Sequence, residues 1–372
     1  MPSDTSTVLV TGVAGNLGSR LLPLLRDDKI IGVDFHLPLV APAYPFYQLD
    51  LGEESSCGKI ASLLIEKKVH SVVHLAFVLD PLRTAVLDRD RMWRINVAGT
   101  ARVLEAIAEA NRMGGHVSKL VHLSSVAVYG PDLAAPATED TPLHAHTLAY
   151  AVHKREADEV VRSRAESLGN CKVFVLRPHI FAGRSMENYM VGALRGTAYG
   201  VGRLGRRLER KSARLPLLLP YGKKYLEHKL QFIHVDDMAR LIAFIVRHSN
   251  PTERLTILNV AARGDAMTIG ECARLANSEI KRWPTRTLSR AVIKMMWSLG
   301  ISSIPPDAFP YLVGSYTMDT ARLRKFLGPN YTEVIRHTNH EAFLDNLAGI
   351  PETVTAPEKT QKREKTQNAL TN

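Results

Sequence analysis

The chain begins with an apolar segment that runs directly into a glycine-rich turn, and this feature constrains the fold more than any other. Residues 7–11 (TVLVT) are mostly β-branched or apolar and predict a buried strand. Gly12, Gly15 and Gly18 follow at three-residue spacing, and an apolar helical pattern continues through residues 21–25. A strand, a glycine turn and a helix in this order predict the first βα unit of a Rossmann-type, doubly wound parallel sheet.

The same turn predicts a dinucleotide site. Gly12 allows the tight turn, Gly15 lets the backbone approach a pyrophosphate, and Gly18 permits close packing of the helix. Asn16 and Leu17 lie at the helix N-terminus, where unpaired N–H groups attract an anion. We therefore expect these five residues to contact a cofactor.

An acidic residue at the end of the second predicted strand indicates which dinucleotide binds. Residues 30–33 (IIGV) lead to Asp34, which lies 22 residues after Gly12, where a carboxylate hydrogen-bonds a ribose 2′-hydroxyl. Phe35 and His36 follow, so no adjacent Arg or Lys is placed to receive a 2′-phosphate. The pattern favours NAD over NADP.

Tyr150 and Lys154 form a candidate proton-transfer pair. They lie four residues apart in a predicted helix, so their side chains share one helix face. A free tyrosine has a pKa of about 10, and a useful base near neutral pH requires a shift of ~3 units. A cation about 4 Å away supplies a shift of roughly that size. We therefore expect Lys154 to lower the pKa of Tyr150.

The remaining pattern predicts an α/β domain followed by a smaller lobe. The chain of 372 residues exceeds the usual limit of about 250–300 residues for one core. We predict a Rossmann domain at 1–180, a substrate lobe at 181–350 interleaved with the last Rossmann elements, and a disordered tail at 351–372. The longest helix is predicted from Asp90 to Asn111. The predicted strands lie near residues 7–11, 29–35, 47–51, 70–77, 119–125 and 171–178.

Taken together, these motifs resemble the NAD-dependent epimerase/dehydratase family, the extended short-chain dehydrogenases/reductases, and within it the nucleotide-sugar epimerases. The resemblance covers residues 7–265, and its motifs occur in the family's order and spacing. They are TGVAGNLG at 11–18, HLAF at 74–77 for the family's HLAA, NVAGT at 96–100, LSSVAVYG at 123–130, YAVHK at 150–154, LRP at 176–178 and FIHVDD at 232–237.

The resemblance implies a role for each matching residue. Tyr150 would exchange a proton with a substrate hydroxyl that Ser125 holds, with Ser124 as the weaker candidate for that role. Lys154 would hydrogen-bond the nicotinamide ribose, and Asn96 would support the site or have no chemical role. The family's other cofactor contacts fall on Asp50, Leu51, Leu75, Ala76 and Pro178.

Departures from the family pattern narrow the reaction. Val126 and Ala127 occupy the places where sugar dehydratases and decarboxylases carry acidic residues, so epimerisation or simple oxidation and reduction remain. Residues 229–231 (KLQ) lack the diphosphate-binding Arg, and His179 stands where epimerases carry Asn. The predicted substrate is nucleotide-sugar-like, with a lipid-like or steroid-like alcohol as the alternative. A catalytically silent NAD-binding regulatory protein is the alternative of another class.

Histidines outside these motifs are expected to be structural. We interpret His74, His122 and His179 as core or cleft histidines with satisfied hydrogen bonds. His234 and Asp236 are interpreted as a polar pair that tethers the substrate lobe.

Composition excludes several classes of protein. The net charge is +11, but aromatic residues make up only 6% and no nucleic-acid-binding module is present, so we expect no nucleic-acid partner. The three cysteines are widely spaced, which predicts neither disulfides nor a metal site and favours a reducing cytoplasm. The sequence contains no run of ~18 apolar residues, the length that a membrane-spanning helix requires, so we expect no membrane-spanning segment. We expect a small, anionic substrate and allow a homodimer.

Two basic segments leave open what they contact. Nine Lys and Arg residues lie between Arg203 and Lys229, where they could close over a diphosphate or form a solvated face. A helical pattern at 286–299 carries Arg286, Arg290 and Lys294 beside apolar residues. Such a helix can lie on a membrane or pack on its own domain, and we favour packing.

Overall fold

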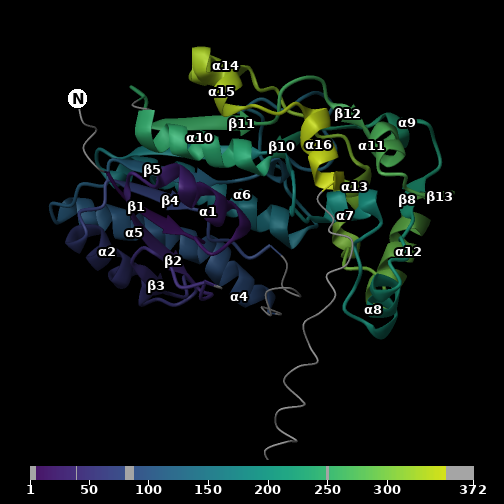
Figure 1. The fold of residues 1–372 in the computed structure, drawn as a ribbon, viewed down its shortest axis with the longest axis horizontal. Helices are drawn as coiled ribbons and strands as arrows, with labels where there is room; N and C mark the ends of the chain where they lie inside the picture. The colour runs from purple at the N-terminus through teal and green to yellow at the C-terminus, as the bar shows by residue number, and fades with distance from the viewer. Residues whose placement is uncertain (1–5, 39, 80–87, 249–250, 349–372) are drawn as a thin grey trace, which may run out of the picture.

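A seven-stranded, fully parallel sheet forms the centre of the computed structural model, which describes residues 6–38, 40–79, 88–248 and 251–348 (Figure 1). The strand order is β11-β6-β5-β4-β1-β2-β3, which confirms the predicted Rossmann-type fold class. The predicted tail at 351–372 lies outside the described residues. The strands of the sheet are β1 (Thr7–Thr11), β2 (Lys29–Asp34), β3 (Phe46–Gln48), β4 (Ser71–His74), β5 (Lys119–Leu123), β6 (Lys172–Pro178) and β11 (Leu255–Val260).

Helices cover both faces of the sheet, which is why its strands are almost wholly apolar. Along β1, Leu9 packs on one face, whereas Val8 and Val10 pack on the other. The first face is covered by α2 (Ser56–Glu66), α5 (Gly99–Arg112) and α6 (Ala149–Arg164). The opposite face carries α1 (Asn16–Leu21), α10 (Val235–His248) and α14 (Ala321–Leu327).

The longest predicted helix is present but is not uniform. It consists of α4 (Arg89–Trp93), a π-helical turn (Arg94–Ala98) and α5, which follow one another without a break. The π-helical turn was not predicted, and it contains Asn96. Such turns insert one residue into a helix and occur frequently at functional sites.

The C-terminal lobe is built from three pairs of short strands. These are β7 (Ile180–Ala182) with β10 (Phe232–His234), β8 (Leu217–Pro220) with β13 (Ile280–Trp283), and β9 (Lys229–Leu230) with β12 (Met267–Thr268). Its helices are α7 (Tyr189–Arg195), α8 (Arg203–Arg210), α9 (Lys224–Glu227), α11 (Ile269–Leu275), α12 (Arg286–Ser298), α13 (Phe309–Val313) and α16 (Asn339–Ala348). Helix α15 (Tyr331–Val334) instead packs with α10 and α14 over the sheet. The lobe has its own apolar core, in which Phe232 and Phe343 stack with ring centroids 5.0 Å apart.

His234 and Asp236 lie together, since the Asp236 N–H donates to His234 Nδ1 at 3.1 Å, and His234 Nε2 lies 3.2 Å from Asp345 of α16. Asp236 pairs with Arg20 of α1 at 2.7 Å, and Arg20 also donates to the Arg184 carbonyl in the lobe at 2.8 Å. His234, Asp237 and His337 also bring three groups of metal-ligand type within 4.8 Å of one another. Asp237 already pairs with Arg240, whose charge balances this carboxylate without a metal ion.

None of the helices in the described part of the chain combines the length and apolarity that crossing a lipid bilayer requires.

Candidate active site

Two cavities meet beyond the carboxyl ends of the sheet strands. The larger, of about 520 Å³, lies over the glycine turn, and the smaller, of about 380 Å³, lies between the Rossmann domain and the lobe. Four residues line both cavities: Leu79, Tyr150, Phe181 and Met186. Open α/β sheets bind ligands at this edge.

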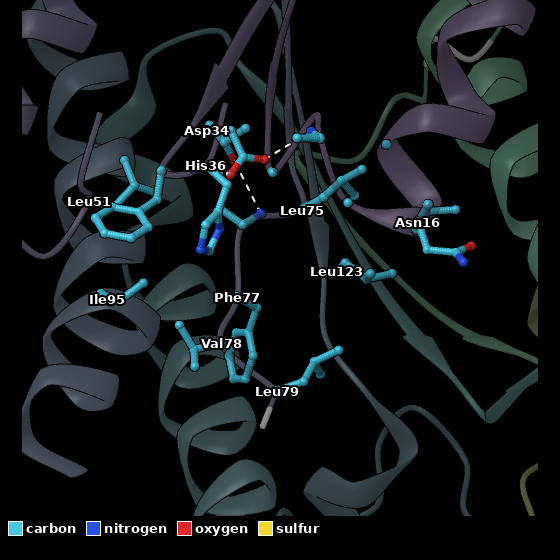
Figure 2. A pocket seen from close by; sticks show the side chains of 18 of the residues that line it. Asn16, Asp34, His36, Leu51, Leu75, Phe77, Val78, Leu79, Ile95 and Leu123 are labelled. Carbon is cyan, nitrogen blue, oxygen red and sulfur yellow. Dashed lines mark hydrogen bonds between the residues drawn. The ribbon is translucent and has the colours of Figure 1, made fainter. Parts of the chain in front are cut away.

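The larger cavity gathers almost all of the predicted cofactor residues. Figure 2 shows Leu51 and Ile95 on one side of it and Asn16 on the other. The predicted residues that line it are Gly12, Gly15, Asn16, Leu17, Gly18, Asp34, Asp50, Leu51, Leu75, Ala76, Tyr150 and Lys154.

Two predicted cofactor residues, Asn96 and Pro178, do not line this cavity. Asn96 is fully buried; its Oδ1 accepts from the Val78 N–H at 2.7 Å and its Nδ2 donates to the Val78 carbonyl at 3.1 Å. Asn96 therefore fixes a segment of the cavity wall from behind. Pro178 is the buried last residue of β6 and pairs with Val260 of β11, which keeps it inside the sheet.

The glycine turn has the close backbone packing that a dinucleotide site requires. A Cβ atom at Gly12 would lie 2.6 Å from the Ala76 backbone nitrogen, and Gly12 has a φ of +71°. A Cβ atom at Gly18 would lie 2.5 Å from the Val13 carbonyl oxygen. Only glycine fits at either position, so the turn and helix α1 approach closely and leave room for a pyrophosphate.

Asp34 is held in place at the adenosine end of the cavity. Its Oδ2 accepts from the Ala14 N–H at 2.9 Å and its Oδ1 from the His36 N–H at 3.0 Å (Figure 2). Each carboxylate oxygen has a further lone pair, so the half-buried group can still accept from a ribose hydroxyl. The residues present therefore fit NAD.

A cation that was not predicted lies near this end of the cavity. Arg91 Nη2 pairs with Asp50 Oδ2 at 3.2 Å, and the guanidinium lies 5.4 Å from the centre of the Phe35 ring. Arg91 comes from α4, far from Asp34 in the sequence, so residues next to Asp34 give no sign of it.

Tyr150 and Ser125 are brought together where the two cavities join. A hydrogen bond between their side chains lowers the pKa of the Tyr150 phenol, but burial raises this pKa by more, so the pKa lies above its ordinary value. The Ser125 hydroxyl also accepts from the Ala127 N–H at 3.1 Å, which fixes its position. Tyr150 is therefore a protonated phenol at neutral pH.

Lys154 does not act on Tyr150 as the sequence predicts. Its Nζ donates to the Leu123 carbonyl at 2.6 Å and lies 3.7 Å from the centre of the Phe77 ring. Burial lowers the pKa of Lys154 to about 7, and the Asp158 carboxylate opposes this shift. The predicted lowering of the Tyr150 pKa by Lys154 is not found in this structure, because burial raises this pKa and the hydrogen bond to Ser125 is the interaction that lowers it.

Phe77 is a site residue that sequence reasoning missed. Its ring meets Tyr150 edge-on, with ring centroids 5.8 Å apart, while Lys154 lies over its face. The ring therefore packs against both members of the proton-transfer pair. The signal was present in the sequence, because Phe77 replaces the last alanine of the family's HLAA motif.

A buried ion pair anchors the helix that carries Tyr150 and Lys154. Asp158 and Arg177 are fully buried, and the guanidinium donates to both carboxylate oxygens at 2.9 Å. The Ser124 hydroxyl donates to Asp158 at 2.6 Å, so Ser124 is structural and Ser125 is the serine that faces Tyr150. Arg177 also donates to the Tyr129 hydroxyl at 2.7 Å. These bonds join α6 to β5 and β6.

The smaller cavity is largely apolar. His179 lines it and is satisfied, since its Nε2 contacts the Tyr316 carbonyl at 3.0 Å and its Nδ1 accepts from the Ile180 N–H at 2.9 Å. Burial lowers the pKa of His179 to about 4, so the imidazole is neutral. Its apolar and aromatic lining comprises Leu79, Val126, Ala127, Leu148, Ile180, Phe181, Met186, Tyr189, Met190, Val191, Ala198, Ala308, Tyr311, Leu312 and Tyr316.

The basic segment between Arg203 and Lys229 does not line either cavity. Its helix α8 lies at the lower right tip of the lobe in Figure 1. The basic segment is therefore not positioned over either cavity, where it could contact a bound diphosphate. Arg195, from the preceding helix α7, lines the smaller cavity instead.

The histidines of the sheet differ in how well they are satisfied. His74 contacts the hydroxyls of Thr11 at 2.7 Å and Thr100 at 3.0 Å, as predicted. His122 stacks on His74 with ring centroids 5.6 Å apart, but neither of its ring nitrogens has a hydrogen-bond partner among the described residues. The prediction of a satisfied His122 is wrong, because its partner in β6 is the apolar Val175 and its partner in β4, His74, directs its ring nitrogens to Thr11 and Thr100.

The strand order and the cavity over the glycine turn are those of a Rossmann-type dinucleotide-binding domain, and a second cavity joins the first. The chain belongs to the NAD dependent epimerase/dehydratase family, whose model matches residues 8–261. The family is NAD-dependent, which confirms the predicted cofactor.

Several epimerases are among the known proteins to which the chain is similar. UDP-glucose 4-epimerase of Erwinia amylovora is 27% identical over 46% of this chain and 52% of its own length. UDP-glucose 4-epimerase of Mycolicibacterium smegmatis is 34% identical over 37% of this chain and 44% of its own length. The chain thus spans about half the length of these relatives. The structure of Thermus thermophilus UDP-glucose 4-epimerase with NAD superposes with a TM-score of 0.63 at 20% identity, covering 92% of this chain and 98% of that one.

Proposed function

We propose that the protein is an NAD-dependent epimerase or oxidoreductase that acts on a hydroxyl or carbonyl group of a nucleotide-sugar-like substrate. One observation carries this proposal: Tyr150, hydrogen-bonded to Ser125, lines both the dinucleotide cavity and the smaller cavity. A substrate in the smaller cavity would therefore have its reacting hydroxyl beside the phenol and its carbon facing the cofactor.

NAD, when bound, accepts or returns a hydride at the carbon that carries this hydroxyl. In its phenolate form Tyr150 takes the hydroxyl proton during oxidation, and as the phenol it returns the proton during reduction, while Ser125 holds the same oxygen. Lys154 donates to the Leu123 carbonyl, which holds the amine at the wall of the larger cavity. Val126 and Ala127 next to Ser125 supply no second acid or base, so elimination and decarboxylation are not supported.

A nucleotide-sugar-like substrate is supported by similarity. The relatives from Erwinia amylovora and Mycolicibacterium smegmatis are UDP-glucose 4-epimerases, and the family as a whole comprises epimerases and dehydratases. The alignments cover about half of each relative.

A second candidate substrate is an apolar alcohol. The observation that favours it is the lining of the smaller cavity, which is mostly aliphatic and aromatic and includes no residue of the basic segment between Arg203 and Lys229. A steroid-like alcohol is apolar enough to fill such a cavity. A nucleotide sugar would instead place its charged diphosphate in apolar surroundings.

A panel of substrates distinguishes these candidates. The purified protein, saturated with NAD, is mixed with UDP-glucose, UDP-galactose or a steroid alcohol. NADH absorbance and the stereochemistry of the recovered compound are then measured. We expect interconversion of the UDP-sugars or their oxidation with NADH formation. Turnover of the steroid alcohol alone would establish the second candidate, and NAD binding with no turnover of any compound would indicate a regulatory protein.

A further inference from the structure

The smaller cavity contains one buried cation that the reaction does not use. Arg195 is the last residue of α7, and only 9% of its surface is exposed. It is the sole Lys or Arg among the described residues that line this cavity. We propose that Arg195 binds an oxyanion of the substrate, a phosphate or a carboxylate, and so selects anionic substrates. The inference rests on the proposed function and names the substrate class of that site.

The guanidinium of Arg195 is incompletely paired. Its Nη1 donates to Asn346 Oδ1 at 3.2 Å, whereas its Nε is buried and has no hydrogen-bond partner among the described residues. The carboxylate that acts on it electrostatically is that of Glu187, which lines the same cavity. Because a guanidinium stays charged in proteins, a buried and unpaired one is costly, and an oxyanion would satisfy it.

Neighbouring groups hold Arg195 in position before any ligand binds. The Asn346 side-chain amide donates to the Gly183 carbonyl at 2.9 Å and to the Met186 carbonyl at 2.8 Å, which leaves its oxygen facing Arg195. Met186 is itself one of the residues that line both cavities. The guanidinium is therefore fixed relative to the point where the substrate meets the cofactor, which reduces the entropy lost on binding.

Two nearby charges act on Arg195. The Arg214 guanidinium disfavours its charged form, while the N–H groups of Arg214 donate to the backbone carbonyls of Arg195 at 2.9 Å and Asn277 at 3.0 Å. The exposed Glu187 carboxylate, which also lines the cavity, favours the charged form more strongly. In this largely apolar cavity an oxyanion at the Nε of Arg195, which has no partner among the described residues, would interact strongly with the guanidinium.

The oxyanion could belong to a nucleoside diphosphate or to an apolar carboxylic acid. A bidentate fork suits phosphate and carboxylate equally well, so the guanidinium alone does not distinguish them. The two sources are separated by titrating the NAD-saturated protein with matched pairs of probes: UDP against uridine, and octanoate against octanol.

The test compares wild type with Arg195→Met and Arg195→Lys by calorimetry. We expect Arg195→Met to lower the affinity for UDP or octanoate about tenfold or more, which is the size of a lost charge-assisted hydrogen bond. The affinity for uridine or octanol should fall less than about threefold. Arg195→Lys should retain part of the anion affinity. Arg203→Met, on the exposed face of α8, removes the same charge outside the cavity and should change none of the affinities. NAD affinity is measured in every variant.

Wild-type protein provides a measurement that does not depend on how a variant folds. UDP or octanoate should protect Arg195, but not Arg203, from an arginine-specific dicarbonyl reagent, as read by mass spectrometry. Unchanged anion affinity in Arg195→Met, or wild type that binds neither anion more tightly than its neutral counterpart, would overturn the proposal. Anion binding at Arg195 without turnover of any panel compound would leave this site standing and refute the proposed function.

Discussion

At the level of single residues, we propose that Asp34 determines which dinucleotide the larger cavity accepts. Its carboxylate is fixed by two backbone N–H groups and faces the cavity, so it would repel a 2′-phosphate. Arg91 lies over the Phe35 ring near this end, but it is paired with Asp50. How strongly the site repels a 2′-phosphate therefore depends on how the folded chain arranges Asp34, Asp50 and Arg91.

We expect Asp34→Ala to narrow the preference for NAD over NADP, because the repulsion and the hydrogen bonds to the ribose diol are lost together. Isothermal titration with both cofactors measures this preference. Glu54→Ala, which removes an exposed carboxylate on the same domain, should leave it unchanged. Tighter binding of NADP than of NAD by the wild type would contradict the role assigned to Asp34.

Buried histidines make the stability depend on acid. Burial lowers the pKa of His74 from 6.5 to about 3, and it also lowers the pKa of His122. Below pH 6.5 the unfolded chain binds protons that the folded chain cannot bind until about pH 3, so the free energy of unfolding falls as pH falls through this window. The full effect for His74 is on the order of 5 kcal/mol, at ~1.4 kcal/mol per pH unit.

Urea unfolding between pH 7 and pH 4 checks this expectation. In His74→Gln, the free energy of unfolding should fall less steeply as the pH is lowered. The decline that remains comes from His122. His116→Gln, at an exposed position, should show the wild-type slope. A His74→Gln protein whose unfolding free energy falls as steeply as that of the wild type would refute the assignment.

At the level of elements, the glycine turn and the helix after it form the rigid part of the cofactor site. Gly18→Ala would place a methyl group 2.5 Å from the Val13 carbonyl, so the turn must move. Gly58→Ala in α2 is a matched control, because nothing lies within 4 Å of its Cβ position. The control should raise the unfolding free energy by roughly 0.5–1 kcal/mol.

We expect Gly18→Ala to weaken NAD binding at least tenfold and to lower the melting temperature, whereas Gly58→Ala leaves NAD binding unchanged. Calorimetry and thermal unfolding measure both effects. Wild-type NAD affinity in Gly18→Ala would show that the cofactor does not depend on this turn.

Elements with strong local signals were predictable from the sequence. All six predicted strands are present, although the strand predicted at 70–77 ends at His74, because the residues after it leave the sheet to line the cofactor cavity. The seventh strand, β11, was not predicted, since it follows the lobe segments in sequence and joins the sheet only through the fold. The π-helical turn around Asn96 also has no local signal, because it depends on the contact between Asn96 and Val78.

At the level of the whole molecule, the cofactor half of the site was predictable and the substrate half was not. Glycine turns and YxxxK pairs are read from local spacing. The smaller cavity instead combines α7 with residues such as Ser303, Tyr311 and Tyr316, which lie more than a hundred positions further along the chain. Arg195 could not be distinguished in the sequence from the many surface arginines, because its burial depends on Asn346 of α16.

The central claim is that proton transfer through Tyr150 couples the two cavities. It is tested by Tyr150→Phe, assayed with NAD and whichever panel compound the wild type converts, across a range of pH. Because burial raises the pKa of Tyr150, the wild-type rate of oxidation should rise with pH above neutrality. Tyr47→Phe, in β3 and outside both cavities, is the matched control. We predict that Tyr150→Phe lowers turnover at least ~10²-fold while NAD affinity stays within a few-fold. Near-normal turnover in Tyr150→Phe would contradict the claim.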